Sequence, residues 1–113
     1  MKLTIYQIDG SRDVDHAKFR DSKFLMAKYG EIRVDPGIYV SVFSGELPRK
    51  TLEAVFVTCN RDIRPIGFRG HSVSVSDVVA VEESDTVAPG FYFCDAFGFK
   101  KILFDTSKTI QKE

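Results

Sequence analysis

A chain of 113 residues is long enough for one ordinary domain and too short for two. Its 16 basic and 16 acidic residues give a formal net charge of zero, which argues against DNA, RNA or an anionic membrane as an obligatory partner, because no long-range field attracts them. The opening residues hold no apolar run of signal or membrane-span length, so we expect a cytoplasmic protein without membrane attachment.

The first half of the chain predicts a strand, a helix and a second strand. Polar and apolar residues alternate over Leu3–Ile8, which is the period of a half-buried strand. Ser22 is a suitable N-cap for a short helix over Lys23–Tyr29, and the glycine that follows supplies the stop. A second strand is expected over Ile38–Phe43, closed by the next Ser-Gly, with its last two apolar residues on opposite faces.

A second helix has the clearest signals. Thr51 is its N-cap, and Asn60 is expected to end it in the left-handed conformation. Apolar residues fall at positions i, i+3, i+4 and i+7, which are Leu52, Val55, Phe56 and Cys59. Val57 adds an apolar position beside this stripe, so we expect the helix to lie deep against the sheet.

The second half predicts three more strands. Short β-branched or aromatic runs bounded by turn residues indicate strands at Val78–Val81, Phe91–Cys94 and Phe99–Phe104. The order β-α-β-α-β-β-β predicts an α+β fold, with a mostly antiparallel sheet of about five strands and two helices packed on one face. We expect a single domain over residues 1–106 and a polar C-terminal tail over residues 107–113, frayed from Thr106 onward.

No pattern in the sequence is typical of a metal or cofactor site, and we predict neither. The histidines are His16 and His71 and the cysteines are Cys59 and Cys94, and no pair among them has a zinc spacing. No glycine-rich loop joins a strand to a helix, as phosphate binding would require. Both cysteines lie in apolar patterns, which favours buried, reduced thiols over a disulfide between them.

A polar stretch precedes the third predicted strand, and it has two interpretations. In the first, His71 and Ser72 join Asp77 or Asp95 in a hydrolase triad, or His71 activates Cys94. Adjacent residues such as His71 and Ser72 point in different directions on most backbones, and the serine lacks a G-x-S-x-G context. A thiol in the middle of an aromatic strand is normally inert. We therefore predict no catalytic residues.

In the second, favoured interpretation, these side chains shape the backbone. Short side chains that carry hydroxyl or carboxylate groups bond to nearby N–H groups and support a tight approach to a buried strand. Glycine allows a turn conformation that a side chain would resist. The residues assigned this structural role are Gly70, His71, Ser72, Ser74, Ser76, Asp77, Asp95 and Gly98.

Three segments of the chain carry a specific resemblance. They read T-L-E-A-V-F-V-T-C-N at 51–60, R-P-I-G-F-R-G-H-S-V-S-V-S-D-V-V-A-V at 64–81, and F-Y-F-C-D-A-F-G-F at 91–99. In this order the chain resembles the YodL-like domain of Firmicutes, which joins a T-L-E helix to a G-H-S-x-S-V-S-D-V segment and a Tyr/Phe-rich strand ending in D-x-F-G-F. The motifs cover about half of the chain.

The resemblance implies a genetic setting more than a chemistry. Domains of this type occur as short proteins and as modules of large polyvalent proteins on conjugative elements and phages, and the family has no established catalytic residues. The resemblance therefore implies a protein of a mobile genetic element that acts on the machinery of the host cell, including restriction or CRISPR defences.

A basic connector, residues 61–69, follows the second predicted helix, and together with the residues around it offers a binding surface. Residues 49–71 contain five basic residues against the acidic Glu53 and Asp62, an excess of three positive charges. Arginine and aromatic side chains are common anchors at protein interfaces, and basic segments also contact phosphates. The expected binding residues are Arg61, Arg64, Phe68, Arg69 and Tyr39.

We expect a non-enzymatic protein-binding module whose partner is a host or element-encoded protein, contacted by such anchors or by strand addition at an exposed sheet edge. The main hypothesis is inhibition of a host defence effector. One alternative is a nucleic-acid-binding accessory domain that uses residues 49–71. Another is an inhibitor of a host housekeeping protein unrelated to defence. The sequence predicts neither the identity of the target nor the oligomeric state.

Overall fold

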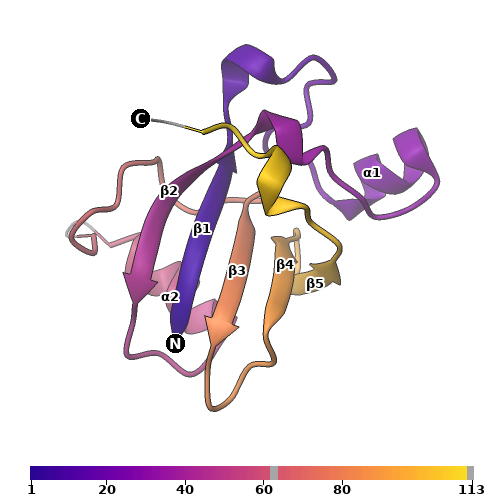
Figure 1. Cartoon of the computed structure of the whole chain (residues 1–113). Helices are drawn as coiled ribbons and strands as arrows, with labels where there is room; N and C mark the ends of the chain where they lie inside the picture. Colours follow the sequence, from indigo (N-terminus) through magenta and orange to yellow (C-terminus); the bar gives the residue numbers. More distant parts are fainter. Residues whose placement is uncertain (62–63, 112–113) are drawn as a thin grey trace.

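The computed structural model describes residues 1–61 and 64–111, and its main feature is one antiparallel sheet (Figure 1). The strands are β1 (Lys2–Ile8), β2 (Tyr39–Glu46), β3 (Val78–Glu83), β4 (Gly90–Cys94) and β5 (Phe99–Ile102). The α-helices are α1 (Ser22–Tyr29) and α2 (Leu52–Cys59), and short 3-10 helices are η1 (Gly10–Arg12), η2 (Pro36–Ile38) and η3 (Thr106–Lys108). Two short parts of the chain lie outside the described residues: residues 62–63 of the predicted connector and residues 112–113 of the predicted tail. Asp62, which was counted among the acidic residues of segment 49–71, is one of them.

The strands lie in the order β2-β1-β3-β4-β5, and every neighbouring pair is antiparallel. The first strand of the chain therefore lies inside the sheet, between β2 and β3. The later strands form two successive hairpins, β3–β4 and β4–β5. The predicted α+β class and the predicted element order are confirmed.

Alternation along the strands divides the core into two clusters on opposite faces of the sheet. The first cluster joins one face to α2 and includes Leu3, Ile5, Val55, Cys59 and Val79. The second joins the other face to α1 and includes Ile8, Leu25, Val78 and Phe93. Figure 1 shows α2 behind the sheet and α1 beyond its β5 side. The prediction that both helices pack on one face is therefore wrong.

The start of α1 differs from the prediction in its cap. The N-cap is Asp21, whose Oδ1 accepts the Phe24 N–H at 3.2 Å, and the predicted cap Ser22 is the first helical residue. The hydroxyl of Ser22 donates to Asp95 instead. The stop is as predicted, since Gly30 adopts the left-handed conformation with φ 75°. The contact with Asp95 joins residues far apart in the sequence, which is why local pattern did not indicate it.

The second helix begins as predicted and ends differently. Thr51 is its N-cap and accepts the Ala54 N–H at 3.0 Å. Asn60 follows the helix with φ −108°, so the predicted left-handed stop is wrong. The side-chain amide of Asn60 pairs with the Val73 backbone, a long-range contact that the left-handed prediction did not consider. Val57 is 55% exposed, so α2 packs by its predicted stripe and not by this second apolar position.

A β-bulge changes the pattern of β2. Ile5 pairs with Phe43 and the next residue of β1 pairs with Ser41, so Val42 has no partner in the register. Val42 and Phe43 both belong to the first core cluster, whereas strict alternation predicted opposite faces. The strand also continues to Glu46, past the Ser-Gly that was expected to end it.

The segment after β5 packs against the sheet. β5 ends at Ile102, two residues before the predicted end. The chain then forms η3, and Ile110 donates its N–H to the Tyr39 carbonyl at 2.8 Å and bridges Val40 in parallel. Thr109 is buried. The prediction of a frayed end is therefore wrong for residues 106–111, because backbone pairing to β2 orders a segment whose composition is polar.

Candidate functional site

The segment Gly70–Asp77, called here the signature segment, is anchored by a buried side-chain amide from β1. Gln7 donates from Nε2 to the His71 carbonyl at 2.9 Å and to the Asp77 Oδ2 at 3.0 Å, and its Oε1 accepts the His71 N–H at 3.2 Å. Asp77 Oδ2 also accepts the Ser74 N–H at 2.8 Å. One glutamine therefore satisfies both ends of the segment, and its own polar atoms are satisfied in return.

Two further contacts fix the middle of the signature segment. Asn60 at the end of α2 accepts the Val73 N–H at 2.6 Å and donates to the Val73 carbonyl at 2.9 Å. Ser74 donates its hydroxyl to the Ser72 carbonyl at 2.9 Å. These contacts replace the ladder bonds that an irregular buried backbone lacks.

The imidazole of His71 bonds to the Ser72 carbonyl, which also accepts the Ser74 hydroxyl. Its Nδ1 lies 2.7 Å from the Ser72 carbonyl oxygen, which can only accept, so Nδ1 carries the proton. Its Nε2 is buried without a hydrogen-bond partner among the described residues, and its ring meets the edge of Phe19 at 5.4 Å. The imidazole therefore serves as a packed side chain with one backbone contact.

Ser76 connects four parts of the fold. Its φ of 85° places it in the left-handed region, a strained conformation that its contacts maintain. Its N–H donates to the Cys94 carbonyl at 2.9 Å, its Oγ accepts the Phe19 N–H at 2.9 Å, and its carbonyl accepts the Tyr39 hydroxyl at 2.6 Å. The start of β3 is thereby fastened to β4, to β2 and to the connection before α1.

Asp95, at the β4–β5 turn, also joins separate parts of the fold by hydrogen bonds. It accepts the Ser22 N–H at 3.0 Å, the Ser22 hydroxyl at 2.6 Å and the Ala96 N–H at 2.8 Å. Its own N–H donates to the carbonyl of Gly98, which has φ 72°. Burial by itself would raise the pKa of the Asp95 carboxyl, but these hydrogen bonds outweigh it and lower the pKa.

Asp77 has the opposite electrostatic situation. The residue is 1% exposed, and desolvation raises the pKa of its carboxyl to about 7 against the hydrogen bonds from Ser74 and Gln7, which lower it. Desolvation also raises the pKa of the Tyr39 hydroxyl well above its ordinary value. Burial therefore favours the neutral form of both groups.

The structure does not assemble the hydrolase or thiol arrangements considered for this stretch. Ser72 Oγ accepts from Arg64 at 3.0 Å, and His71 Nδ1 bonds to a backbone carbonyl. Both cysteines are buried and free, and burial raises the thiol pKa of Cys59 to about 11 and of Cys94 to about 12. Among residues 1–61 and 64–111, no group of three or more His, Cys, Asp or Glu side chains is placed to hold a metal ion.

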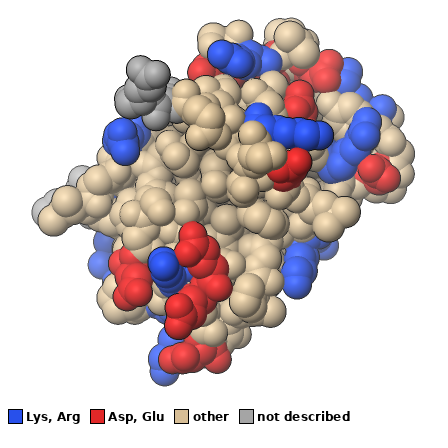
Figure 2. All heavy atoms as spheres, in the orientation of Figure 1, with Lys and Arg blue, Asp and Glu red and all other residues tan. Residues whose placement is uncertain are grey.

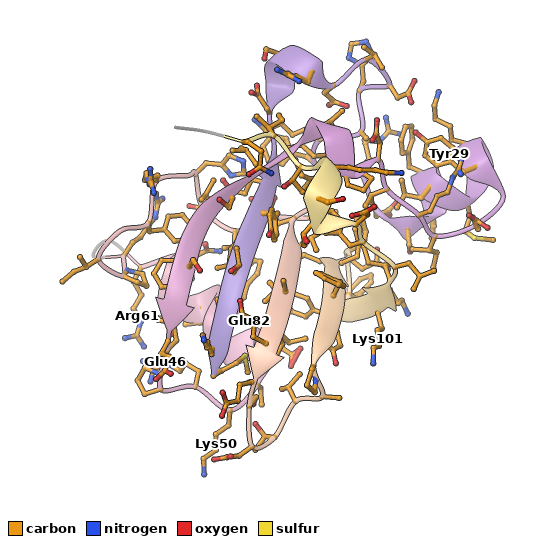
Figure 3. All side chains as sticks on the ribbon, viewed as in Figure 1. Tyr29, Glu46, Lys50, Arg61, Glu82 and Lys101 are labelled. Carbon is orange, nitrogen blue, oxygen red and sulfur yellow. The ribbon has the colours of Figure 1, made fainter. Side chains whose placement is uncertain are left out.

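Charged side chains of both signs occupy the surface. On the face shown in Figure 2 they lie toward the rim, around a central area of other residues. Glu46 and Glu82 lie at the end of the sheet where β1 begins (Figure 3), and Glu82 pairs with Lys2 at 3.4 Å. This interspersed pattern agrees with the zero net charge.

The predicted basic connector lies against the outer edge of β2. Arg69 donates its N–H to the Val42 carbonyl at 2.8 Å, and the Phe68 ring stacks on Phe43 at 6.1 Å. Arg64 donates to the Gly70 carbonyl at 3.1 Å, and its guanidinium lies 5.6 Å from the Phe68 ring centre. The connector is therefore attached at several points.

The predicted binding residues separate into two groups. Arg61, Arg64 and Arg69 are exposed and Phe68 is partly buried (Figure 3 labels Arg61), and of these four Arg64 lies over the Phe68 ring. Tyr39 is 1% exposed, so its prediction as a surface anchor is wrong. Its ring belongs to the second core cluster and its hydroxyl is used by Ser76.

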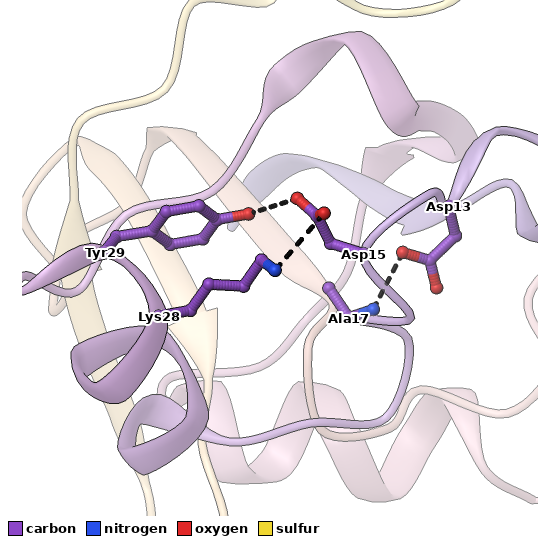
Figure 4. Close-up of polar contacts among 5 residues, drawn as sticks. All are labelled: Asp13, Asp15, Ala17, Lys28 and Tyr29. Carbon is purple, nitrogen blue, oxygen red and sulfur yellow. Dashed lines mark hydrogen bonds and ion pairs between the residues drawn. The ribbon is translucent and has the colours of Figure 1, made fainter.

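A third anchored region joins α1 to the connection that precedes it (Figure 4). Asp15 accepts the Tyr29 hydroxyl at 2.8 Å and pairs with Lys28 at 3.3 Å. Asp13 accepts the Ala17 N–H at 2.8 Å. Hydrogen bonding from Tyr29 is the largest cause of the lowered pKa of the exposed Asp15 carboxyl. These contacts hold α1 against the connection that precedes it.

The model of the YodL-like domain family matches residues 2–104, nearly the whole chain. The chain belongs to the YodL-like domain family. A search of curated proteins and a search of solved structures gave no match. The residues matched by the family model end before η3. The C-terminal segment that bonds to the start of β2 through Ile110 therefore lies outside the matched part of this YodL-like domain. No helix in the described part of the chain is long and apolar enough to cross a membrane.

Sequence reasoning missed two anchors of the YodL-like domain, Gln7 and Asn60. A signal for Gln7 was present, because it follows Leu3 and Ile5 at the period of a strand and is therefore a polar residue on a buried face. Asn60 followed a helix, where an asparagine is most simply explained as a stop. Its bond to Val73 depends on a connector whose path the sequence does not specify.

Proposed function

We propose that this YodL-like domain is a non-enzymatic protein-binding module of a bacterial mobile genetic element and that it inhibits a host protein, such as a restriction or CRISPR defence effector. The mobile-element setting comes from the family resemblance. The binding role is supported by the exposed surface of the connector.

One observation carries the proposal: Ile66 is 100% exposed on the connector, between Arg64 and Arg69. An exposed aliphatic side chain flanked in the sequence by arginines on an anchored loop resembles the apolar centre and polar rim of a protein interface. The anchoring matters because a pre-ordered loop loses little conformational entropy on binding. The contacts of Arg64 with Gly70 and of Arg69 with Val42 supply that order.

The signature segment supports the non-enzymatic part of the proposal. Its serines, its histidine and Asp77 form hydrogen bonds with backbone groups or with Gln7 and Arg64. A nucleophile and a base facing a shared open space would be required for acyl transfer. The enzymatic alternative predicts that Ser72→Ala or Cys94→Ala abolishes a host effect while the free energy of unfolding is unchanged.

The proposal is tested by capture of the tagged protein from recipient bacteria, identification of the bound protein by mass spectrometry, and direct binding with the purified partner. We expect Ile66→Ser to lose the captured protein. Val14→Ser is the matched control, because Val14 is also highly exposed but lies in the connection before α1. Equal loss with both variants, or retention with both, would remove the connector from the proposal.

Nucleic-acid binding is the second candidate, favoured by the three exposed arginines of the connector. Phosphate contacts make affinity fall steeply as salt rises. The measurement is fluorescence anisotropy of labelled single- and double-stranded oligonucleotides over a salt series, with Arg61→Gln, Arg64→Gln and Arg69→Gln combined. Steep salt dependence that this triple variant abolishes would favour nucleic acid over protein. The identity of a captured protein separates a defence effector from a housekeeping target.

A further inference from the structure

The outer edge of β5 is open, unlike the outer edge of β2. The sheet order places β5 last, and among the described residues it pairs with no strand except β4. At the opposite edge, Arg69 donates to the Val42 carbonyl of β2 and Ile110 donates to the Tyr39 carbonyl. An open strand edge presents unpaired N–H and C=O groups to which an extended segment can add.

A hollow of about 650 Å³ lies beside this edge. It is lined by three residues of the segment after α1, by the last two residues of β5 and by the residue that follows them, namely Glu31, Ile32, Arg33, Lys101, Ile102 and Leu103. Ile102 is buried and Leu103 is 94% exposed, so the hollow has an apolar side chain at its floor and another at its rim. Its volume lies within the usual range of ligand sites, about 300–1,000 Å³.

The charges around the hollow are mainly positive. Lys100 and Lys101 are exposed on β5; Lys101 lines the hollow and its side chain also lies close to Gly90 of β4. Arg33 is the second cation that lines the hollow, and Glu31, 3.8 Å from it, is the one carboxylate that does so. An arriving segment therefore meets two cations and one anion beside an apolar floor, and Lys100 adds a further positive charge on the same strand.

The far wall of the hollow is held in place. The guanidinium of Arg33 lies 4.8 Å from the Tyr29 ring centre, and the Tyr29 hydroxyl donates to Asp15 (Figure 4). A wall fixed in this way keeps its distance from β5 without help from a ligand, which lowers the entropy cost of binding.

We propose that the β5 edge binds an extended acidic segment of a partner protein by strand addition. Apolar side chains of the segment would contact Leu103 and Ile32, and alternate acidic side chains would meet Lys101 and Arg33. A second copy of this chain fits less well, because β5 pairing with β5 brings the Lys100-Lys101 pairs of both copies together. This surface is distinct from the connector, so the inference goes beyond the function proposed above.

Lysines on an edge strand also have a purely protective explanation, since they discourage edge-to-edge aggregation. The two explanations differ in what they predict. Protection requires repulsion alone and predicts no preference among extended peptides. Binding predicts a preference for acidic peptides that depends on both the charges and the apolar side chains of the hollow.

The test uses the full chain and a short fluorescein-labelled peptide in which glutamate alternates with valine, with a lysine-valine peptide as its counterpart. Binding is measured by fluorescence anisotropy, and NMR chemical-shift mapping locates it. We expect saturable binding of the acidic peptide, with the largest shifts at the amides of Phe99–Leu103. We expect the double variant Lys100→Glu/Lys101→Glu to weaken binding at least about tenfold, the double variant Lys100→Arg/Lys101→Arg to retain it, and Leu103→Thr to weaken it.

The matched control is Lys50→Glu/Lys108→Glu, which changes the net charge equally at exposed lysines outside β5. Equal weakening by the control would show attraction by net charge alone and would overturn the proposal. So would binding without shifts in β5, absence of binding, or sedimentation showing dimers that form through β5. Ile66→Ser should leave peptide binding unchanged, which keeps this test independent of the connector.

Discussion

The two edge strands of the sheet, β2 and β5, differ in whether other parts of the chain cover their outer edges. The outer edge of β2 is covered at Val42 by the connector and at Tyr39 and Val40 by the C-terminal segment. β5 has four residues, two of them lysines, and keeps its outer edge open. The comparison indicates that covering an edge requires a supporting network, because the connector is held in place by Gly70, Gln7 and the signature segment behind it. Breaking that network should expose β2 and leave β5 unchanged.

The largest effect is expected from Gly70→Ala. A Cβ at this position would meet the Gln7 side chain and the Val42 Cγ1, well inside contact distance. We expect the free energy of unfolding to fall by about 3–5 kcal/mol, since overpacking adds to the loss of buried hydrogen bonds. Urea denaturation measures the loss, and hydrogen exchange should rise in β2 before β5. Gly10→Ala, where a Cβ has room, is the control and should change stability by less than about 0.5 kcal/mol.

The next effect depends on pH and concerns the Asp77 carboxyl, whose pKa is raised from 3.8 to about 7. Between these values the folded chain holds a proton that the unfolded chain has lost, so stability falls as pH rises through this window. Asp77→Asn keeps an acceptor for Gln7 and Ser74 and removes the titration. In this variant, the slope of the free energy of unfolding against pH should change by close to one proton between pH 4 and 7. At about pH 8 the variant should be more stable than the parent by roughly 2–4 kcal/mol. An unchanged slope in denaturation curves between pH 4 and 7 would refute the assignment.

A smaller effect is expected from shortening the C-terminal segment, which covers the start of β2. A chain that ends at Thr109 lacks the Ile110 N–H that donates to the Tyr39 carbonyl. We expect a loss of about 1–2 kcal/mol, from one buried bond and an apolar side chain, and faster hydrogen exchange of the residues that begin β2. A chain that ends at Gln111 is the control. Unchanged exchange in the shorter chain would show that the C-terminal segment does not protect this edge.

The smallest effect is expected at β5. Leu103 is almost fully exposed, so Leu103→Thr should alter the free energy of unfolding by less than about 0.5 kcal/mol while weakening peptide binding at this edge. Thermal or urea denaturation gives the first quantity and anisotropy the second. Loss of stability beyond about 1 kcal/mol would indicate that Leu103 packs against the fold and that the edge is not open.

The sequence was sufficient wherever a short pattern decides the structure. The five strands, the Thr51 cap and the Gly30 stop follow from periodicity and local hydrogen bonding. In the signature segment, Asp77 accepts a nearby backbone N–H as expected, that of Ser74. Ser72 instead bonds to the Arg64 side chain, and Ser76 accepts the N–H of the distant Phe19. The family assignment rests on the same motifs and is confirmed over residues 2–104.

Predictions that depended on distant residues were less successful. Tyr39 was assigned to the surface because strand alternation does not say which face is covered, and its face is covered by Phe104 and α1. The bulge at Val42 is invisible to alternation, since one extra residue changes the face of those that follow. The Asn60–Val73 and Ser22–Asp95 contacts join parts of the chain that meet only in the folded protein.

The position of β1 has a consequence for synthesis on the ribosome. Its residues emerge before those of its neighbours β2 and β3, so its second partner is complete only after Glu83 has been made. At roughly 5–20 residues per second, the nascent chain carries an apolar strand without both partners for several seconds. The sheet therefore closes around β1 only after β3 has emerged, and a chaperone that shields apolar segments would find its target in β1 until then.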